Sequence, residues 1–422
     1  MANVTPNSPV EPQTLDPDEL KTAFNQSSGA YKVWIDREQP ETGRGIGVAV
    51  VDTGIDGQHP DFRTSTTDPT SRVVASAIVN PYATGAGDGY GHGTHVAGLI
   101  AGDSGKRPAG DPLSGAYAGT APDAHLVNVK VADDDGNATV LDVIHGLQFV
   151  VDHKDAYNIR VVNLSLRSTT EQSYRTDPLD AAVEQAWFRG IVVVAAAGND
   201  GAGPGMLGHA PANDPFIITV GGVDDRATKN IKDDVTATWS SRGVTQDGFA
   251  KPEIMAPGTR LHSALAAGSR FAELCPACVQ DGAYIRASGS SMSAGVVSGI
   301  AALVIERHPE WTPDQVKHAL MEGRIMRSGE AEVAAQKAVL ADGTRANRGV
   351  IPNELIDPRT GSIDFTRATW SRATWSEAID PLRATWSRAT WSCADCWSTS
   401  DIRVQALRAT WSRATWSARL GD

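Results

Sequence analysis

The stretch that decides the fold is Gly47-Val48-Ala49-Val50-Val51-Asp52, a short apolar run that ends in a carboxylate. Apolar runs of this length are typical of strands that are buried on both faces of a parallel sheet. Similar runs follow at Leu126–Val131, Arg160–Leu166, Ile191–Ala197 and Phe216–Val220. Between them, Val140–His153 and Pro178–Phe188 show the apolar spacing of amphipathic helices. This alternation predicts an α/β protein, namely a three-layer α/β/α domain with a mostly parallel central sheet.

The bulk composition is that of an ordinary globular protein with an acidic surface. The chain has 422 residues, of which 41% are hydrophobic and 21% charged, and its formal net charge is −12. Phosphate contacts need clustered Lys and Arg, so this charge argues against a nucleic-acid partner. The sequence has no run of about 18 uninterrupted apolar residues, and we therefore expect no membrane span.

Three segments are expected along the chain. Residues 1–42 are rich in Pro, Asp, Asn, Gln and Ser and predict an irregular N-terminal arm, with one short helix around Asp18–Phe24. Residues 43–365 hold the α/β pattern and form the main domain, which Gly361–Phe365 would close with a short strand. Residues 366–422 form a separate C-terminal tail.

The tail is a Trp-rich extension built from a repeat. The pentapeptide Arg-Ala-Thr-Trp-Ser occurs six times and forms three tandem pairs. The six copies begin at Arg367, Arg372, Arg383, Arg388, Arg408 and Arg413. Thr and Trp favour strands, which suggests a strand that docks on its own chain or on a neighbour. A surface or glycan anchor, self-association, and a low-complexity extension without fixed structure remain alternatives.

Three short motifs carry reactive side chains. Val51-Asp52-Thr53-Gly54 places a carboxylate at the carboxyl end of a buried strand, the edge at which open α/β sheets bind ligands. Gly91-His92-Gly93-Thr94 holds a histidine among small residues at the start of a predicted helix. Ser288-Gly289-Ser290-Ser291 places a serine at the N-terminus of the apolar helix Val296–Ile305, whose dipole favours negative charge there. Taken singly, each motif could equally supply a turn, a core histidine or a helix cap.

Together the three motifs resemble the Asp, His and Ser boxes of the subtilase family, in the chain order known for subtilisin. The resemblance runs from Tyr31 to Leu320. Further segments that match family landmarks are Gly119–Pro122, Asn163–Leu166, Ala195–Asn199 and Lys251–Gly258. The resemblance implies a serine endopeptidase that acts on protein or peptide substrates and requires no cofactor for its chemistry.

The resemblance also assigns a role to each residue of the site. Ser291 would be the nucleophile, His92 the general base, and Asp52 the carboxylate that orients the imidazole. Asn199 matches the side-chain donor of the oxyanion hole, with the backbone N–H of Ser291 as its partner.

Four residues are expected to bind the substrate. The substrate backbone would pair as an added strand with Ser165 and Leu166, and Gly198 would flank the pocket for the residue before the cut. Arg167 stands where the family usually has glycine. Its side chain would either narrow the binding site and favour acidic residues upstream of the cut, or fold out into solvent.

Two further groups suggest metals or cross-links. Asp61 matches a family calcium ligand, which makes a structural calcium a hypothesis, although the loop 102–119 that should complete the site is long and altered. Cys275-Pro-Ala-Cys278 and Cys393-Ala-Asp-Cys396 are two Cys-x-x-Cys pairs. They are compatible with disulfides, with a four-thiolate zinc site that joins the tail to the main domain, or with free thiols.

The alternative to a protease function is a tail that mediates assembly or surface anchoring. In that case the protease domain is a scaffold or is inhibited. The N-terminus carries no secretory signal as written. We expect a secreted mature form, with a cytoplasmic protein as the alternative.

Overall fold

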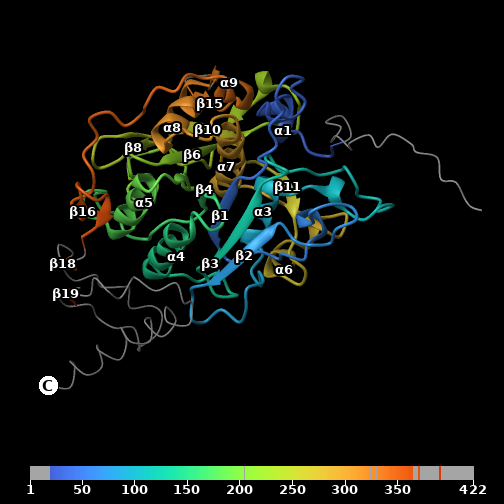
Figure 1. The fold of residues 1–422 in the computed structure, drawn as a ribbon, viewed down its shortest axis with the longest axis horizontal. Coiled ribbons are helices and arrows are strands. Elements are labelled where there is room, and N and C mark those ends of the chain that lie inside the picture. The colour runs from blue at the N-terminus through green and yellow to red at the C-terminus, as the bar shows by residue number, and fades with distance from the viewer. Residues whose placement is uncertain are drawn as a thin grey trace, which may run out of the picture.

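The computed structural model describes residues 20–364, apart from 204, 324, 328 and 329, together with residues 369–370 and 389–390. A large sheet crosses the molecule (Figure 1). Its strands are β1 (Gly47–Asp52), β2 (Val73–Ile78), β3 (His125–Lys130), β4 (Ile159–Leu164), β5 (Val192–Ala196), β6 (Ile218–Asp224), β7 (Val235–Thr236), β10 (Ile254–Pro257), β14 (Ile325–Arg327) and β15 (Glu330–Glu332).

The strand order is β14-β15-β10-β6-β5-β4-β1-β3-β2, with β7 paired to β6. Neighbouring strands are parallel except for β14 with β15 and β6 with β7. All six residues of β1 are buried, as the apolar run predicts. The five runs found in the sequence form β1, β3, β4, β5 and β6, so the prediction of a mostly parallel sheet is confirmed.

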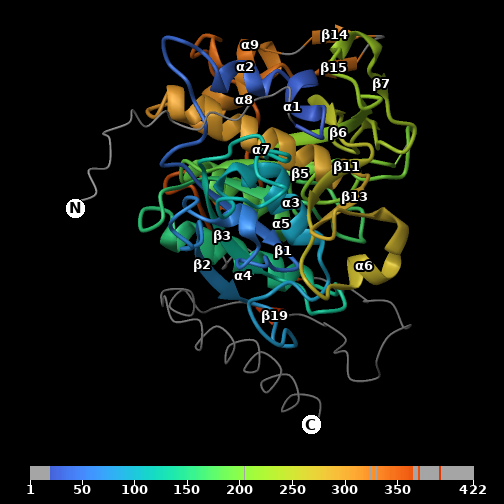
Figure 2. The same ribbon diagram turned by 90° about the vertical axis from the view of Figure 1, so that its right-hand side faces the viewer.

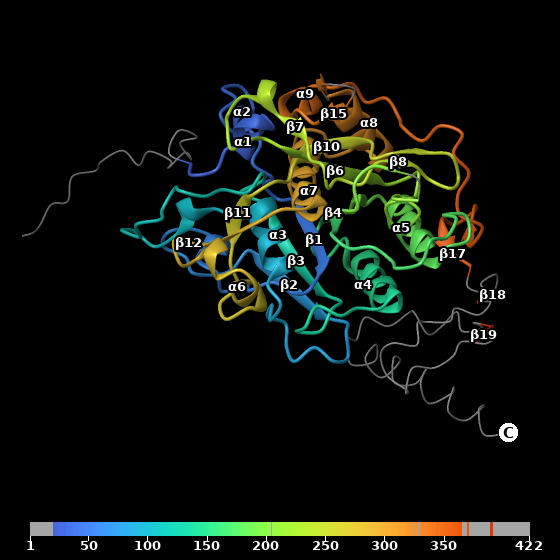
Figure 3. The same ribbon diagram turned by 180° about the vertical axis from the view of Figure 1, so that it is seen from behind.

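Helices cover both faces of the sheet. They are α3 (His92–Ala101), α4 (Val140–His153), α5 (Pro178–Phe188), α7 (Ser290–Arg307), α8 (Pro313–Glu322) and α9 (Ala335–Val339). α4 and α5 pack against each other on one face, whereas α3 and α7 pack against each other on the opposite face (Figures 1 and 3). These three layers confirm the predicted fold class.

Local sequence signals fix the helix starts. Thr139 and Asp142 form a capping box at α4, and Thr312 and Gln315 form another at α8. Asp177 accepts hydrogen bonds from the first turn of α5, where Pro178 has no N–H to satisfy. α7 is buried along most of its length, because it is apolar on nearly every side.

Smaller elements surround this body. They are α1 (Phe24–Ser27), α2 (Ala30–Trp34), α6 (Arg270–Leu274), β8 (Gly243–Val244), β9 (Ala250–Lys251), β11 (Leu261–Ala264), β12 (Val279–Gln280), β13 (Tyr284–Ala287), β16 (Ile356–Asp357), β17 (Ser362–Ile363), β18 (Thr369–Trp370) and β19 (Ala389–Thr390). β11, β13 and β12 form a three-stranded sheet in that order. α6 lies beside this sheet at the edge of the molecule (Figure 2).

The N-terminal segment differs from the predicted irregular arm. From residue 20 onward it packs into the core, where Leu20, Phe24 and Trp34 are 8%, 1% and 8% exposed. The Trp34 indole N–H donates to the carbonyl of Thr120 at 2.9 Å. These apolar side chains belong to the hydrophobic core, and α2 packs against α9. The short helix expected around Asp18–Phe24 begins instead at Phe24.

Only some of the predictions for the C-terminal region fall on residues that the structure describes. Ser362–Ile363 forms the expected strand, but it pairs with β16 beside α5 and does not join the main sheet. β18 and β19, from two copies of the pentapeptide, pair antiparallel. The rest of the repeat tail lies outside the described residues, and the segment limits at 42/43 and 365/366 stay predictions. None of the described helices is long and apolar enough to cross a membrane.

Candidate active site

The candidate site forms at the carboxyl edge of three adjacent parallel strands. Asp52 is the last residue of β1, Ser165 directly follows β4, and Asn199 lies just beyond β5. On the covering layer, His92 opens α3 and Ser291 is the second residue of α7. Because parallel strands end at the same edge, residues far apart in the sequence meet there.

Asp52 and His92 form a hydrogen-bonded pair. The distance from His92 Nδ1 to Asp52 Oδ1 is 2.7 Å, and the same carboxylate oxygen accepts the N–H of Thr53 at 2.7 Å. The side chains of His92 and Asp52 are 18% and 4% exposed. Burial lowers the pKa of His92, but the charge and hydrogen bond of Asp52 outweigh burial and raise this pKa above its usual value of 6.5. A carboxylate on Nδ1 leaves Nε2 as the nitrogen that can accept a proton.

Asp88, which belongs to none of the three sequence motifs, organises the start of α3. Its two carboxylate oxygens accept hydrogen bonds from the Thr53 hydroxyl, the Gly91 N–H, and the N–H and hydroxyl of Thr94, all between 2.7 and 2.8 Å. Burial raises the pKa of Asp88, and these hydrogen bonds oppose the rise. The network joins the end of β1 to the helix turn that carries His92. An acidic residue shortly before the glycine that starts a helix is the signal that could have identified it.

Ser291 and the end of β4 contact each other reciprocally. The Ser291 hydroxyl donates to the carbonyl of Ser165 at 3.3 Å, and the Ser165 hydroxyl donates to the carbonyl of Ser291 at 3.1 Å. The Asn163 amide holds the Ser165 hydroxyl at 2.8 Å. Leu166 is partly buried against the hydrophobic core. The start of α7 is therefore fixed against the strand end where we expect the substrate backbone to pair.

Ser290 fixes the orientation of the Asn199 amide. The Ser290 backbone N–H and hydroxyl both donate to Asn199 Oδ1, at 2.9 and 3.0 Å. A backbone N–H can only donate, so the amide oxygen must face Ser290 and the NH₂ group must lie on the other side. The Gly198 N–H donates to the Ser290 hydroxyl at 3.0 Å, and Gly198 has a φ of +105°. Ser290 is a second supporting residue that sequence reasoning missed.

Arg167 has an exposed side chain that carries a paired charge. Its guanidinium forms an ion pair with Asp200, and both side chains are about two-fifths exposed, at 37% and 42%. A Cβ on Gly198 would lie 3.3 Å from Arg167 Nη1. The guanidinium therefore lies beside Gly198, and its charge is paired with that of Asp200.

Asp61 does not fit the predicted calcium site. Its Oδ1 accepts from Arg107 Nε at 2.6 Å, and its Oδ2 accepts from the Tyr284 hydroxyl at 2.8 Å. The Asp61 and Arg107 side chains are only 3% and 4% exposed. The guanidinium, which comes from the altered loop 102–119, supplies the positive charge that a calcium ion would bring. The calcium prediction at Asp61 is therefore corrected to a buried ion pair.

We expect Arg107→Met to lower the free energy of unfolding by about 3 kcal/mol, because it leaves a buried carboxylate without its cation. Urea denaturation in a Ser291→Ala background, where autolysis is excluded, would measure this loss. The matched control is Asp61→Asn/Arg107→Met, which should regain more than half of the loss. Equal losses in the single and double variants would contradict the ion-pair assignment.

The cysteines of the main domain are paired. Cys275 and Cys278 form a disulfide. Sulfur atoms in a disulfide cannot serve as thiolate ligands. The prediction of a zinc site formed by all four cysteines is therefore wrong. Cys393 and Cys396 lie outside the described residues. Within the described part of the chain, one surface group of three potential ligands, His318, Glu322 and Asp342, lies close enough together to hold a metal. Glu322 and Asp342 are exposed and His318 is partly buried, and we assign the group no function.

The arrangement brings a hydrogen-bonded Asp52–His92 pair and Ser291 to one edge of a parallel sheet that helices cover on both faces. The profile of the subtilase family, peptidase S8, matches residues 43–343. The chain belongs to this family, and it is a subtilisin-like serine endopeptidase.

Individual relatives agree with this assignment. Serine protease AprX of Bacillus subtilis strain 168 is 35% identical over 338 residues, which cover 73% of this chain and 72% of AprX. Subtilisin E of the same organism is 35% identical over 287 residues, covering 67% of this chain and 61% of subtilisin E. Among solved structures, a cold-adapted subtilisin-like serine proteinase matches with a TM-score of 0.54 and 26% sequence identity. The match covers 73% of this chain and 97% of the proteinase. Sphericase has a TM-score of 0.54 at 28% identity, covering 70% of this chain and 89% of that one.

Proposed function

We propose that the chain hydrolyses peptide bonds through an Asp52-His92-Ser291 triad and an acyl-enzyme intermediate. The observation that carries the proposal is the 2.7 Å hydrogen bond between His92 Nδ1 and the buried Asp52 carboxylate. Asp52 fixes the tautomer, so that His92 Nε2 removes the Ser291 proton and later protonates the leaving amine. Since His92 works as a base only when neutral, kcat/KM falls as the pH drops through its pKa.

The oxyanion of the tetrahedral intermediate needs hydrogen-bond donors. The backbone N–H of Ser291 lies in the first turn of α7, where N–H groups have no acceptor within the helix. Asn199 adds its amide NH₂, because its oxygen is occupied by Ser290. The N-terminus of α7 favours the same negative charge through its dipole.

Asn199→Ala should lower kcat by about 10²–10³ and change KM little, because the lost hydrogen bond forms only as charge develops in the transition state. Steady-state kinetics on a peptide substrate would measure the change. Ser290→Ala is the matched control and should cost less, since the Ser290 backbone N–H still holds the amide oxygen. A loss confined to KM in Asn199→Ala would exclude the oxyanion role.

The substrate backbone would run along Ser165 and Leu166 as an added strand, upstream of the cut. Gly198, which lies beside the Arg167 guanidinium, would border the position of the residue before the cut. The Arg167–Asp200 pair favours neither charge at this border, and we infer that specificity there is broad.

A serine-reactive fluorophosphonate tests the proposed function. We expect the purified protein to be labelled at Ser291 alone, as shown by intact and peptide mass, and Ser291→Ala to remain unlabelled. A folded protein that is not labelled would have no activated nucleophile and would exclude the proposal.

We also propose that the protein acts in an oxidising compartment outside the cell. The Cys275–Cys278 disulfide supports this, because such bonds persist mainly in secreted proteins. Assembly through the repeat tail concerns residues outside the described part of the chain and is left as an alternative.

A further inference from the structure

α6 lies next to the proposed general base, and Arg270 at its start forms an ion pair with Asp135. The helix has five residues, Arg270–Leu274, none of which is buried. A helix this short is not stable without outside contacts. Two backbone bonds attach it to the segment before His92: Arg270 N–H donates to Gly89 O, and Phe271 N–H donates to Tyr90 O, both at 2.9 Å.

Phe271 is the side chain of α6 that reaches His92. The two ring centroids are 5.8 Å apart, with an interplanar angle of 86°. Phe271 also packs on Tyr90 at 5.5 Å and on His95 at 6.4 Å. The contact with His92 is T-shaped, a geometry that is favourable for aromatic rings. The phenyl ring therefore limits both the rotation of the imidazole and its contact with water.

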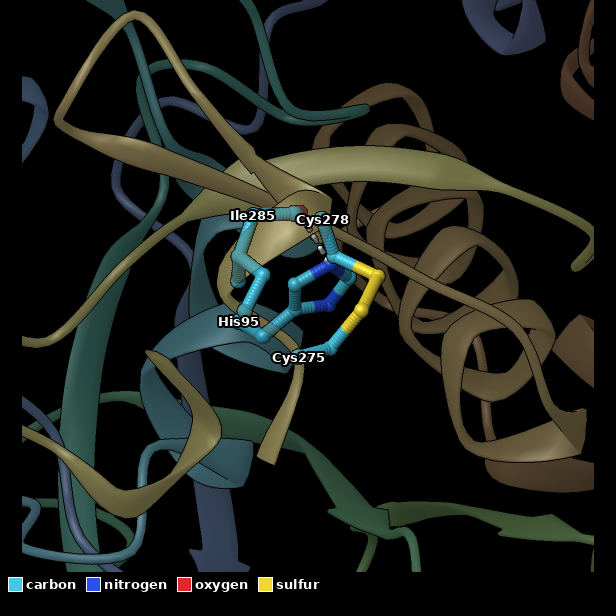
Figure 4. Close-up of a disulfide and its surroundings, with 4 residues drawn as sticks. All are labelled: His95, Cys275, Cys278 and Ile285. Carbon is cyan, nitrogen blue, oxygen red and sulfur yellow. Dashed lines mark hydrogen bonds between the residues drawn. A yellow bond between two sulfur atoms is a disulfide. The ribbon is translucent and has the colours of Figure 1, made fainter. Parts of the chain in front are cut away.

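The disulfide ties the far end of α6 to a sheet (Figure 4). Cys275 ends the helix, and its N–H donates to the carbonyl of Phe271 at 3.2 Å. Cys278 directly precedes β12, whose first residue, Val279, pairs with Ile285 of β13. The carbonyl of Ile285 in turn lies 3.0 Å from His95 Nε2. The Phe271 ring thus packs on Tyr90, and the Phe271 carbonyl accepts the N–H of Cys275, one of the two residues of the disulfide.

We propose that Phe271 is a positioning residue for His92 and that the Cys275–Cys278 disulfide is a redox-sensitive clamp that keeps it in place. This inference rests on the proposed role of His92 as the general base. A dithiol reductant would open the clamp by giving two electrons and two protons, which yields two cysteine thiols and the oxidised, disulfide form of the reductant. Both cysteines are partly exposed and therefore reachable, and their Cys-x-x-Cys spacing is that of thiol–disulfide exchange motifs. Full activity would then require an oxidising environment.

The pH profile distinguishes positioning from general stability. The charged and titratable groups near His92 are Asp52, Asp88 and His95. Burial lowers the pKa of His95 to about 3, so His95 is neutral in the working range. Burial also lowers the pKa of His92, against the two carboxylates that raise it. Removing the phenyl cover should therefore raise the pKa of His92 and move the acidic limb of kcat/KM to higher pH.

The test compares Phe271→Ala, Phe271→Leu and Cys275→Ser/Cys278→Ser with the full-length parent. We expect Phe271→Ala to lower kcat/KM about tenfold and to move the acidic limb up by about 0.5 pH unit, because a misplaced base loses alignment and gains hydration. Phe271→Leu, which keeps an apolar cover, should recover most of both effects. An unchanged acidic limb in Phe271→Ala would overturn the positioning role.

Dithiothreitol tests the clamp, with Cys393→Ser/Cys396→Ser as the matched control because it removes only the other cysteine pair. The parent and this control should lose activity about fivefold on reduction, by the same loss of alignment. Cys275→Ser/Cys278→Ser should start at the reduced level and not respond. If the activity of the Cys393→Ser/Cys396→Ser control does not change with dithiothreitol, the proposed clamp is overturned.

A readout without turnover separates this inference from the proposed function. In a Ser291→Ala background, NMR titration of the His92 imidazole should give a higher pKa with Phe271→Ala than with Phe271→Leu. An inactive parent enzyme would defeat the proposed function, whereas equal His92 pKa values in the two variants would defeat the inference alone.

Discussion

Ser291→Ala should lower the kcat of peptide hydrolysis by about 10⁶, the size of the loss when the nucleophile of subtilisin is removed. The reason is chemical: the alanine has no oxygen to form the acyl-enzyme, and water alone must attack the carbonyl. Residual turnover of about 10³-fold over the uncatalysed reaction would remain from the oxyanion hole and substrate binding. Steady-state kinetics on a chromogenic peptide would measure both.

Ser293→Ala is the matched control for this substitution. Ser293 lies on the same helix, and its hydroxyl donates to the carbonyl of Ala256 at 3.0 Å. Its removal should cost about 1 kcal/mol of stability and leave kcat within about twofold. A Ser291→Ala protein that retained more than about 1% of the parent activity would show that another residue supplies the nucleophile.

Asp52→Asn should lower kcat/KM by about 10⁴ at neutral pH, because an amide can hold the imidazole in the wrong tautomer and cannot stabilise the imidazolium. The pH dependence should change as well. Asp52 is the main cause that raises the pKa of His92, so its neutralisation lowers that pKa. The remaining activity should therefore persist to lower pH than in the parent enzyme.

A pH–rate profile of kcat/KM measures this shift, and its direction is diagnostic. The acidic limb should move down in Asp52→Asn and up in Phe271→Ala. Asp56→Asn is a suitable control, because this partly buried carboxylate accepts bonds from the backbone N–H groups of Gln58 and Ala267 and does not contact His92. An acidic limb that stayed in place in Asp52→Asn would mean that Asp52 does not set the charge state of His92.

The sequence by itself determined the layers of the fold and the residues of the proposed triad. Both signals are local. A buried parallel strand must be apolar throughout, as Gly47–Asp52 is, and helix starts such as Thr312–Gln315 carry their caps within four residues. Asp52, His92 and Ser291 each lie in a short motif with small neighbours, and for that reason the motifs could be read without coordinates.

Only the tertiary structure decided how distant side chains pair. Asp61 and Arg107 are 46 residues apart, and nothing local distinguishes a carboxylate that binds calcium from one that binds a guanidinium. Asp88, Ser290 and Phe271 contact site residues that lie on other elements. The order of residues in the sequence does not reveal such contacts. The physical reason is that charge neutralisation and aromatic packing depend on distances of a few ångströms, and folding, rather than sequence spacing, sets those distances.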